Sequence, residues 1–356
     1  MHSIRDAEIK GKIVLVRTDY NVPLTTTEDG QLIISNDLRI RASLPTLEYL
    51  RNQGADKIIL ISHLGRPEGK DPQLSLKIVA ERLAELLPGT PVSFVDDVSG
   101  PEVAAATEDL PEGGILLLEN LRFFAGEKQN SREFAQAIVD ATHAELFVQD
   151  GFAVVHRAHS STSAITELLP SVAGLLVEKE VQALAKLKTD PEKPFVLVIG
   201  GAKVADKEPL IQEFLPSTDR IIVGGKIAAD GYTNDAPKIY VAEDFDEDST
   251  GQKLDIGPIS TMHLMETVQT AKTVLWNGVL GKVEDPTYAT ASTILAEFLG
   301  EHPEIQSVIC GGDTTGFVEN LQAENTNLQY TLISTGGGAA LEFLTQPALP
   351  GLAALE

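Results

Sequence analysis

The sequence predicts an α/β protein built from two doubly wound parallel sheets, each in a domain of its own. Short apolar runs rich in β-branched residues alternate with longer segments whose apolar residues recur every three or four positions, as on one face of a helix. The alternation stops at a charged amphipathic segment over residues 177–194 and then begins again. A chain of 356 residues is also long enough to bury two cores.

Each half supplies its own series of predicted strands. In the first half, helical periodicity from Arg39 and from Ser75 separates runs at 13–16, 57–62, 92–95, 115–118 and 146–148. The second series runs through 195–200, 220–225, 238–243, 273–278, 307–312 and 330–337. We therefore expect Rossmann-like domains over 1–172 and 194–342, joined by a helix over 173–193.

The composition indicates which kinds of binding partner are disfavoured and which cellular compartment to expect. Asp and Glu number 52 against 28 Lys and Arg, and the formal charge of -24 disfavours nucleic acid and anionic membranes as partners. A single cysteine, Cys310, excludes an internal disulfide and fits a reducing compartment. The N-terminal segment lacks the apolar run of a signal peptide, and no stretch reaches the roughly 18 apolar residues of a membrane helix. We expect a cytoplasmic protein.

Basic side chains gather after the strands of the first half, although the chain as a whole is acidic. A lone arginine usually pairs with a nearby carboxylate, but several arginines at successive strand ends favour a small anion held by their planar forks. His156 and His159 lie three positions apart and leave a metal site as an alternative, without an acidic or cysteine ligand at the usual spacing. The candidate residues here are Arg17, Asp19, Asn21, Arg39, His63, Arg66, Arg122, His156, Arg157 and His159.

The second half instead carries glycines at its strand ends, at 200–201, 224–225, 278, 311–312 and 336–338. Glycines let backbone N–H groups approach phosphate oxygens, Lys203 and Lys207 could add charge, and Asp313 could hold Mg²⁺ on those phosphates. Neither a Walker A loop nor a G-x-G-x-x-G fingerprint is present. The alternating acids at 244, 246 and 248 lack the glycine of a calcium loop, and we interpret them as a solvated loop.

The chain resembles the phosphoglycerate kinases over nearly its whole length. The strings VRTDYNVP, SHLGRP, ENLRF, HRAHSST, GGAKVADK, DIGP, WNG, GGDTT and STGGGA occur in the order of that family. The resemblance implies a two-domain hinge enzyme, with 3-phosphoglycerate or 1,3-bisphosphoglycerate on the N-terminal domain and magnesium ADP or ATP on the C-terminal one. It also implies that the tail 343–356 completes the first domain, and that the enzyme works as a monomer in glycolysis or its reverse.

The resemblance assigns roles to the residues that match the family's motifs. For phosphoglycerate they are Asp19, Asn21, Arg39, His63, Arg66, Arg122 and Arg157, supported by Arg17 and His159. For the nucleotide they are Lys203, Lys207, Gly224, Gly225, Asn277, Glu284 on the ribose, Gly311, Gly312, Asp313 for Mg²⁺, and Thr314. Catalysis is expected from Arg39, Lys203 and the amides of Gly336, Gly337 and Gly338, with no general base.

Departures from the family pattern leave some questions open. The segment between residues 226 and 254 is much shorter than usual, so the base site should be more open and the preference for ATP or GTP is not determined. Lys226 stands for a glycine, Val279 for a proline, Cys310 for a glycine, and QDGFAVVHR for the common NDAFGTAHR. Three alternatives remain: an inactive phosphoglycerate-binding relative, a kinase for another acyl phosphate, and a protein that only uses its acidic surface for interactions.

Overall fold

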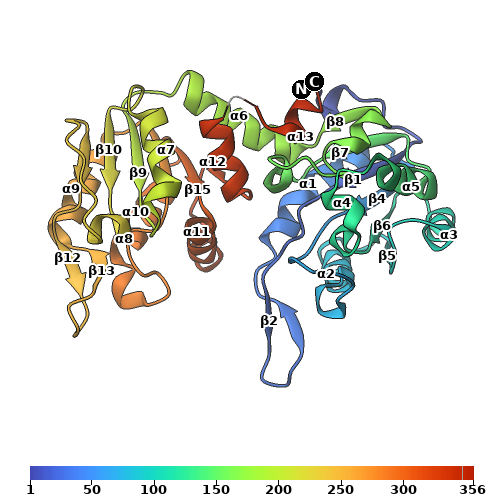
Figure 1. The fold of residues 1–356 in the computed structure, drawn as a ribbon, viewed down its shortest axis with the longest axis horizontal. Coiled ribbons are helices and arrows are strands. Elements are labelled where there is room, and N and C mark those ends of the chain that lie inside the picture. The colour runs from blue at the N-terminus through green and yellow to red at the C-terminus, as the bar shows by residue number, and fades with distance from the viewer. Residues whose placement is uncertain (347) are drawn as a thin grey trace. The chain divides into compact units, whose positions relative to one another are not determined.

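The computed structural model describes residues 1–346 and 348–356, which form two compact units (Figure 1). The first unit contains Met1–Lys179 and Ala348–Glu356, and the second contains Glu180–Pro347. Helix α6 (Leu175–Thr189) begins in the first unit and ends in the second. The predicted boundaries at 172 and 194 lie just outside this helix. The predicted tail over 343–356 begins inside α12 (Gly337–Thr345) and includes Pro347, which lies outside the described residues.

The first unit is built on a parallel sheet of six strands, of which the sequence predicted five; the sixth, at 171–173, was not predicted and contains the predicted domain boundary at 172. Its spatial order is β5-β6-β4-β1-β7-β8, and every neighbouring pair is parallel. The register sets Val14 beside both Ile58 and Leu146. In chain order the strands are β1 (Ile13–Arg17), β4 (Lys57–Ile61), β5 (Val92–Val95), β6 (Gly114–Leu118), β7 (Leu146–Gln149) and β8 (Ser171–Ala173).

Helices cover both faces of this sheet. Val14 and Val16 point into a core shared with α1 (Leu38–Asn52) and α2 (Lys77–Leu86), whereas Leu15 points into a core shared with α3 (Pro101–Asp109) and α5 (Arg132–Thr142). A strand that is buried on both faces needs apolar residues at successive positions. This requirement explains why the strands of the first unit appear in the sequence as unbroken apolar runs.

The second unit repeats the architecture with a different strand order, β11-β10-β9-β14-β15-β16, again entirely parallel. The order reverses between β9 and β14, and ligands of open α/β sheets bind beside such a reversal. The strands are β9 (Phe195–Ile199), β10 (Arg220–Val223), β11 (Ile239–Val241), β14 (Thr273–Asn277), β15 (Gln306–Cys310) and β16 (Leu332–Ile333). The helices are α7 (Val204–Phe214), α8 (Gly225–Ala229), α9 (Pro258–Val268), α10 (Thr290–Glu301), α11 (Gly312–Glu324) and α12.

Helix α6 starts at a buried polar junction in the first unit. Asp150, which follows β7, accepts hydrogen bonds through Oδ1 from Thr46 Oγ1 at 2.9 Å and from Leu176 N at 3.0 Å. The Thr46 hydroxyl oxygen in turn accepts from Leu175 N at 3.0 Å. Asp150 is fully buried, and burial raises the pKa of its carboxyl to about 8.

Two small antiparallel hairpins were not predicted: β2 (Leu24–Thr26) with β3 (Leu32–Ile34), and β12 (Phe245–Glu247) with β13 (Lys253–Ile256). The prediction of a solvated loop at the alternating acids is wrong, because residues 245–247 form β12. Asp244 accepts from the backbone N–H groups of Ile259 and Ser260 at the start of α9, and so has a structural role. Short elements complete the chain: α4 (Ala125–Lys128), α13 (Pro350–Ala353), and 3-10 turns at 4–6, 72–74, 121–123, 152–154, 164–167 and 286–288.

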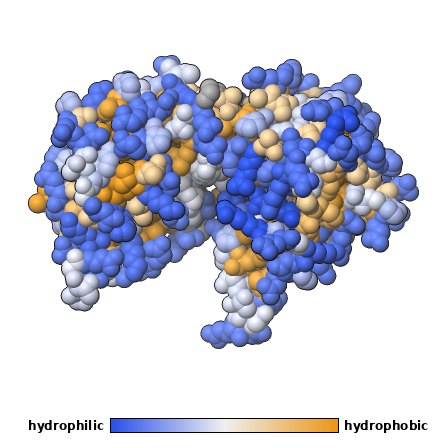
Figure 2. All heavy atoms as spheres, viewed as in Figure 1, coloured by the Kyte–Doolittle hydropathy of each residue, from blue (hydrophilic) through white to orange (hydrophobic). Residues whose placement is uncertain are grey.

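Hydrophilic residues cover most of the face drawn in Figure 2, as expected for a chain with 52 acidic residues. Among the described residues, no helix is both long enough and apolar enough to cross a membrane.

Candidate functional site

Arg17, the last residue of β1, forms the buried floor of the basic cluster in the first unit. Its side chain donates to Ser161 Oγ at 2.8 Å and to the Thr18 carbonyl at 2.5 Å, and its Nη2 lies 3.1 Å from His63 Nδ1. With these donors occupied and only 1% of the residue exposed, Arg17 orders its neighbours instead of facing a ligand. This placement agrees with the supporting role expected for it.

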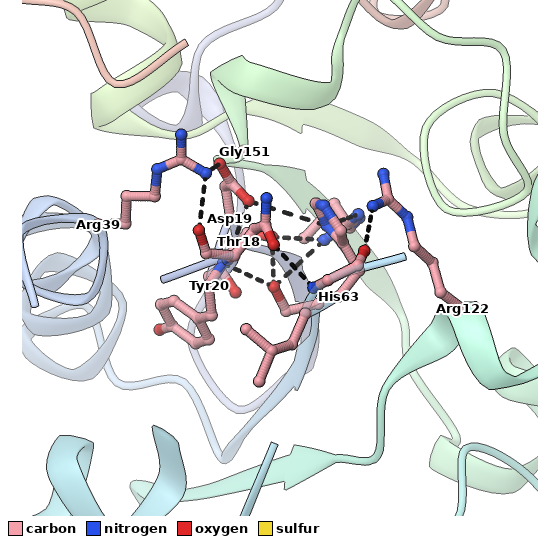
Figure 3. Close-up of polar contacts among 12 residues, drawn as sticks. Thr18, Asp19, Tyr20, Arg39, His63, Arg122 and Gly151 are labelled. Atoms are coloured by element: carbon pink, nitrogen blue, oxygen red, sulfur yellow. Dashed lines mark hydrogen bonds and ion pairs between the residues drawn. The ribbon is translucent and has the colours of Figure 1, made fainter. Parts of the chain in front are cut away.

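Asp19 and Asn21 fix the guanidinium of Arg39, which comes from the first turn of α1. Figure 3 shows Arg39 beside Asp19. Arg39 Nη1 donates to Asp19 Oδ2 at 2.8 Å and to the Asn21 carbonyl at 3.0 Å. The Asn21 side chain accepts from Gly65 N at 2.8 Å, which ties the loop after β4 to the loop after β1. Among the described residues, Nε and Nη2 of Arg39 have no acceptor, so two donors of an oriented arginine remain for an anion.

His63 lies between two arginines, with Arg122 on the side away from Arg39 (Figure 3). Burial, and then the positive charges of Arg17 and Arg122, lower the pKa of His63 well below its usual value. Burial, followed by the charges of Arg17 and Arg157, likewise lowers the pKa of Arg122 to about 10. The imidazole is therefore neutral at pH 7, and the positive charge of this site resides on its arginines. An excess of positive charge that has few carboxylate partners favours a multiply charged anion.

The remaining predicted residues border this cluster. Arg122 donates to the Gly65 carbonyl at 2.6 Å, Arg157 Nε donates to His156 Nε2 at 2.9 Å, and Arg66 is exposed. His159 Nδ1 lies 3.6 Å from a Glu127 carboxylate oxygen. The described residues contain no group of three or more His, Cys, Asp and Glu side chains placed to hold a metal.

Glu127 and Ser161 belong to this site, although the sequence did not single them out. The Glu127 carboxylate accepts from Ser161 Oγ at 2.7 Å and from Ser161 N at 3.1 Å, and Ser161 Oγ accepts from Arg17. Burial alone would raise the pKa of Glu127, but hydrogen bonding to His159 and the charge of Arg17 hold it below its usual value. One buried carboxylate among 52 acidic residues has no sequence signal of its own.

In the second unit, the reversal between β9 and β14 brings together Asn277, at the end of β14, and Lys207 from α7. The Lys207 ammonium donates to Asn277 Oδ1, and burial lowers the pKa of Lys207. Asn277 Nδ2 is buried and has no acceptor among the described residues. Gly278 has φ +103°, and a Cβ there would lie 2.2 Å from the Gly200 backbone, so only glycine fits. A cation and an unused donor thus face the edge where an anion would sit.

Helix N-termini surround the same edge of the sheet. Helices α7, α11 and α12 follow β9, β15 and β16, and none of the three has a side-chain hydrogen bond at its N-cap. The N-cap residues are Lys203, Gly311 and Gly336. A Cβ on Gly337 would lie 3.0 Å from Gly312 N, so a larger residue there would push the starts of α11 and α12 apart by a few tenths of an ångström. Free N–H groups and positive dipole ends at one edge make a cradle for phosphate groups.

A cavity of about 280 Å³ opens beside this cradle, within the second unit. Its lining includes Gly201, Gly225, Glu284, Asp313 and residues of the β12–β13 hairpin. Asp313 is exposed in the first turn of α11, next to Thr314, whose buried hydroxyl accepts from Gly278 N at 2.9 Å. Lys203 is exposed, Gly224 is buried at the N-cap of α8, and Gly338 is exposed in the first turn of α12. The predicted residues of the second half are thereby placed at one edge of one sheet.

Comparisons with known proteins agree with this geometry. The model of the family described as Phosphoglycerate kinase matches residues 4–232 and 229–346. A phosphoglycerate kinase of Coprothermobacter proteolyticus is 41% identical over 399 residues, covering 100% of this chain and 98% of that protein. A phosphoglycerate kinase of Dictyoglomus turgidum is 38% identical over 400 residues, covering 99% of this chain and 98% of that protein.

Two solved structures are similar over the same extent. That of the phosphoglycerate kinase from Pyrococcus horikoshii OT3 has a TM-score of 0.86 at 27% identity, covering 100% of this chain and 98% of that one. That from Coxiella burnetii has a TM-score of 0.77 at 29% identity, covering 99% and 98%. The alignments to relatives run over 399 and 400 positions although this chain has 356 residues, so the relatives contain segments that it lacks.

Proposed function

The chain belongs to the phosphoglycerate kinase family, and from this premise we propose that its first unit binds phosphoglycerate and its second unit binds the nucleotide. The activity is that of a phosphotransferase, which exchanges a phosphoryl group between 1,3-bisphosphoglycerate and ADP to give 3-phosphoglycerate and ATP. The comparisons give no support to an inactive relative or to another acyl phosphate as the substrate. The proposal depends on one observation. A cluster of arginines lies at the strand ends of the first unit, and a glycine-lined cradle for phosphate lies at the strand ends of the second unit.

For phosphoglycerate, we assign the recognition of its negative groups to the arginines around His63. Arg39 is held by Asp19 and Asn21 with two donors free, and Arg122 and Arg157 add charge from the opposite side of the cluster. Neutral His63 accepts from Arg17 through Nδ1, so its proton is on Nε2, which can donate to a ligand without adding charge. Arg66 is exposed and supplies a further guanidinium at the rim.

For the nucleotide, we assign the phosphates to the cradle between β9, β14 and β15. Lys203 and Lys207 would neutralise phosphate oxygens, and the buried Asn277 Nδ2 would donate to one. Glycines 224, 225, 311 and 312 let the chain approach the phosphates closely, and Glu284 lines the cavity where a ribose would follow. Charged donors together with backbone N–H groups match the acceptor-only chemistry of a polyphosphate.

Mg²⁺ would reach this site with the nucleotide. Asp313 is an exposed carboxylate at the cavity, and Thr314 lies beside it with its hydroxyl oriented by Gly278 N. One carboxylate suits a hard cation that keeps water and phosphate oxygens as its other ligands, so the residues present fit the ion. When bound, Mg²⁺ supplies charge neutralisation on the phosphates.

The chain's own contribution to the chemistry is positioning and electrostatics. The acceptor oxygen belongs to a carboxylate or a phosphate that is already charged, so no side chain has to remove a proton. Arg39 would orient the acyl group, while Lys203 and the amides of Gly336, Gly337 and Gly338 would stabilise charge on the moving phosphoryl group. Orientation of the phosphoryl donor and acceptor by bound residues lowers the entropic part of the barrier.

The test is phosphoryl transfer from ATP to 3-phosphoglycerate with Mg²⁺, coupled to reduction of the product. We expect turnover by the native chain and at least about a hundredfold lower kcat/KM in Arg39→Ala and in Lys203→Ala. Arg132→Ala and Lys272→Ala, which remove exposed charges elsewhere in the same two units, are the matched controls and should retain activity. A folded native chain that binds 3-phosphoglycerate but gives no turnover would sink the proposal. The cytoplasmic location and the monomeric state stay predictions.

A further inference from the structure

Glu127 is a buried carboxylate in the short helix α4, which follows the 3-10 turn that carries Arg122. Only 1% of the residue is exposed, so its carboxylate can act on a bound ligand only through its neighbours. Both of its oxygens accept from Ser161, Oε1 from the hydroxyl at 2.7 Å and Oε2 from the backbone N–H at 3.1 Å. Ser161 is itself fully buried, so this pair lies inside the protein.

The hydrogen bonds that lead from Glu127 to His63 can have only one direction. An ionised carboxylate only accepts, so the Ser161 hydroxyl donates its single proton to Glu127. The hydroxyl oxygen then accepts from Arg17 Nε at 2.8 Å. A guanidinium only donates, and Arg17 Nη2 lies 3.1 Å from His63 Nδ1, so that nitrogen is the acceptor and the ring proton is on Nε2.

Glu127 also provides negative charge for Arg17. A buried guanidinium is costly unless a carboxylate lies near it. Burial lowers the pKa of Arg17, and the charge of Glu127, followed by that of Asp19, opposes this shift. Asp19 is already engaged by the guanidinium of Arg39 at 2.8 Å. Among the described residues, Glu127 is therefore the main counter-charge of Arg17.

The same side chain also contacts the loop that carries Arg157 and His159. His159 Nδ1 lies 3.6 Å from Glu127 Oε1, and Ser160 N donates to the Glu127 carbonyl at 3.0 Å. The second contact is a backbone bond, which does not depend on the side chain at position 127. The steps through Ser161 are 2.7 and 2.8 Å long, so the closer coupling of the carboxylate is to Arg17.

From these contacts we propose that Glu127 is a positioning residue for phosphoglycerate binding. Through Ser161 and Arg17 it fixes the tautomer of His63, so that the Nε2–H is available to the ligand. The proposal rests on the proposed function of the first unit and adds a residue to that site. A neutral imidazole whose Nδ1 has no fixed donor populates both tautomers, and phosphate and carboxylate oxygens, which only accept, bind the one that donates from Nε2.

The first measurement is NMR of the His63 ring nitrogens in the ligand-free chain at pH 7, assigned by the signals that are missing in His63→Gln. We expect the native chain to show Nδ1 unprotonated and Nε2 protonated. In Ser161→Ala, which removes one hydroxyl, the two ring-nitrogen chemical shifts should move toward each other as the tautomers mix. Ser163→Ala is the matched control, because the Ser163 side chain makes no cap hydrogen bond, and its spectrum should be native.

The second measurement is steady-state kinetics of the same proteins. Ser161→Ala and Glu127→Gln should each raise the KM for 3-phosphoglycerate about tenfold and leave the KM for ATP unchanged. Glutamine keeps the size of the side chain but has one acceptor oxygen, so its amide nitrogen would face the Ser161 N–H that the second carboxylate oxygen now accepts. Glu81→Gln, at an exposed position on α2, is the control for the change of charge and should have native constants.

Several results would overturn the proposal. A native spectrum with the proton on Nδ1 would contradict the direction of the hydrogen bonds. A change of tautomer without a rise in the KM for 3-phosphoglycerate would exclude a role in binding, and equal rises in both KM values would indicate a general loss of structure. The proposed function fails in a different way, because a folded native chain that does not bind 3-phosphoglycerate in calorimetry would contradict the site itself and, with it, the role of Glu127.

Discussion

Replacing Asp150 by asparagine should stabilise the chain at neutral pH, because the folded structure buries a carboxyl that prefers to be protonated. Asp150 is fully buried, Oδ1 accepts from Thr46 and Leu176, and Oδ2 has no partner among the described residues. Burial raises its pKa from 3.8 to about 8. Asparagine keeps the accepting oxygen and carries no charge, so it imitates the protonated acid.

The sign and the size follow from proton linkage. An acid whose pKa is raised on folding is protonated in both states below its ordinary pKa, so the variant and the native chain should be equally stable near pH 4. As the pH rises toward 8, the native sequence releases this proton only in its unfolded state. The stability of the native sequence relative to Asp150→Asn therefore falls by about 1.4 kcal/mol per pH unit. At pH 7 the upper bound is about 4 kcal/mol, and we expect about 1–3 kcal/mol once the surroundings of the carboxylate relax.

Urea unfolding of the full chain at pH 5, 6, 7 and 8, followed by circular dichroism, gives the difference between the two proteins at each pH. Asp140→Asn, at an exposed position on α5, is the control and should show no trend with pH. A difference that stays flat from pH 5 to pH 8, or an Asp150→Asn variant that is less stable at pH 8 than at pH 5 relative to the native chain, would refute the reasoning.

Three further predictions concern the two sites. Gly278→Ala should lower the free energy of unfolding of the second unit by more than about 2 kcal/mol, because its Cβ would overlap the Gly200 backbone, whereas Gly316→Ala, with open space at its Cβ inside α11, should be neutral or stabilising by about 0.5–1 kcal/mol. Thermal unfolding followed by fluorescence of the single tryptophan gives the melting temperature of each variant. Equal melting temperatures for Gly278→Ala and Gly316→Ala would contradict the steric argument. Asp19→Asn should raise the KM for 3-phosphoglycerate about tenfold and leave the KM for ATP unchanged, since Arg39 loses a charge-assisted hydrogen bond. Asn277→Ala should raise the KM for ATP and leave the KM for 3-phosphoglycerate unchanged. If Asp19→Asn and Asn277→Ala raised the KM of the same substrate, the two sites would be misassigned.

Sequence periodicity was sufficient to predict both parallel sheets, because strands buried on both faces must be apolar throughout, but it missed the edge strand β8 (Ser171–Ala173), which is only three residues long. Glycine and arginine positions after those strands also indicated the two sites, since parallel strands present their carboxyl ends at one edge. The antiparallel hairpins were missed because strands of three or four half-exposed residues, such as Phe245–Glu247, have neither a long apolar run nor a clear alternation. The partners of Arg17 were also missed, because Ser161 is far from it in sequence and is brought near only by the fold.

The three helices that begin at the phosphate cradle without side-chain caps affect how the empty protein should behave. No side chain caps their first N–H groups, so a bound nucleotide would serve as a removable cap for α7, α11 and α12. Fraying of these first turns and occupancy of the site then form one coupled equilibrium. Amide hydrogens at the starts of the three helices should exchange with solvent more slowly when the nucleotide is bound, and this slowing would identify the N–H groups that contact phosphate.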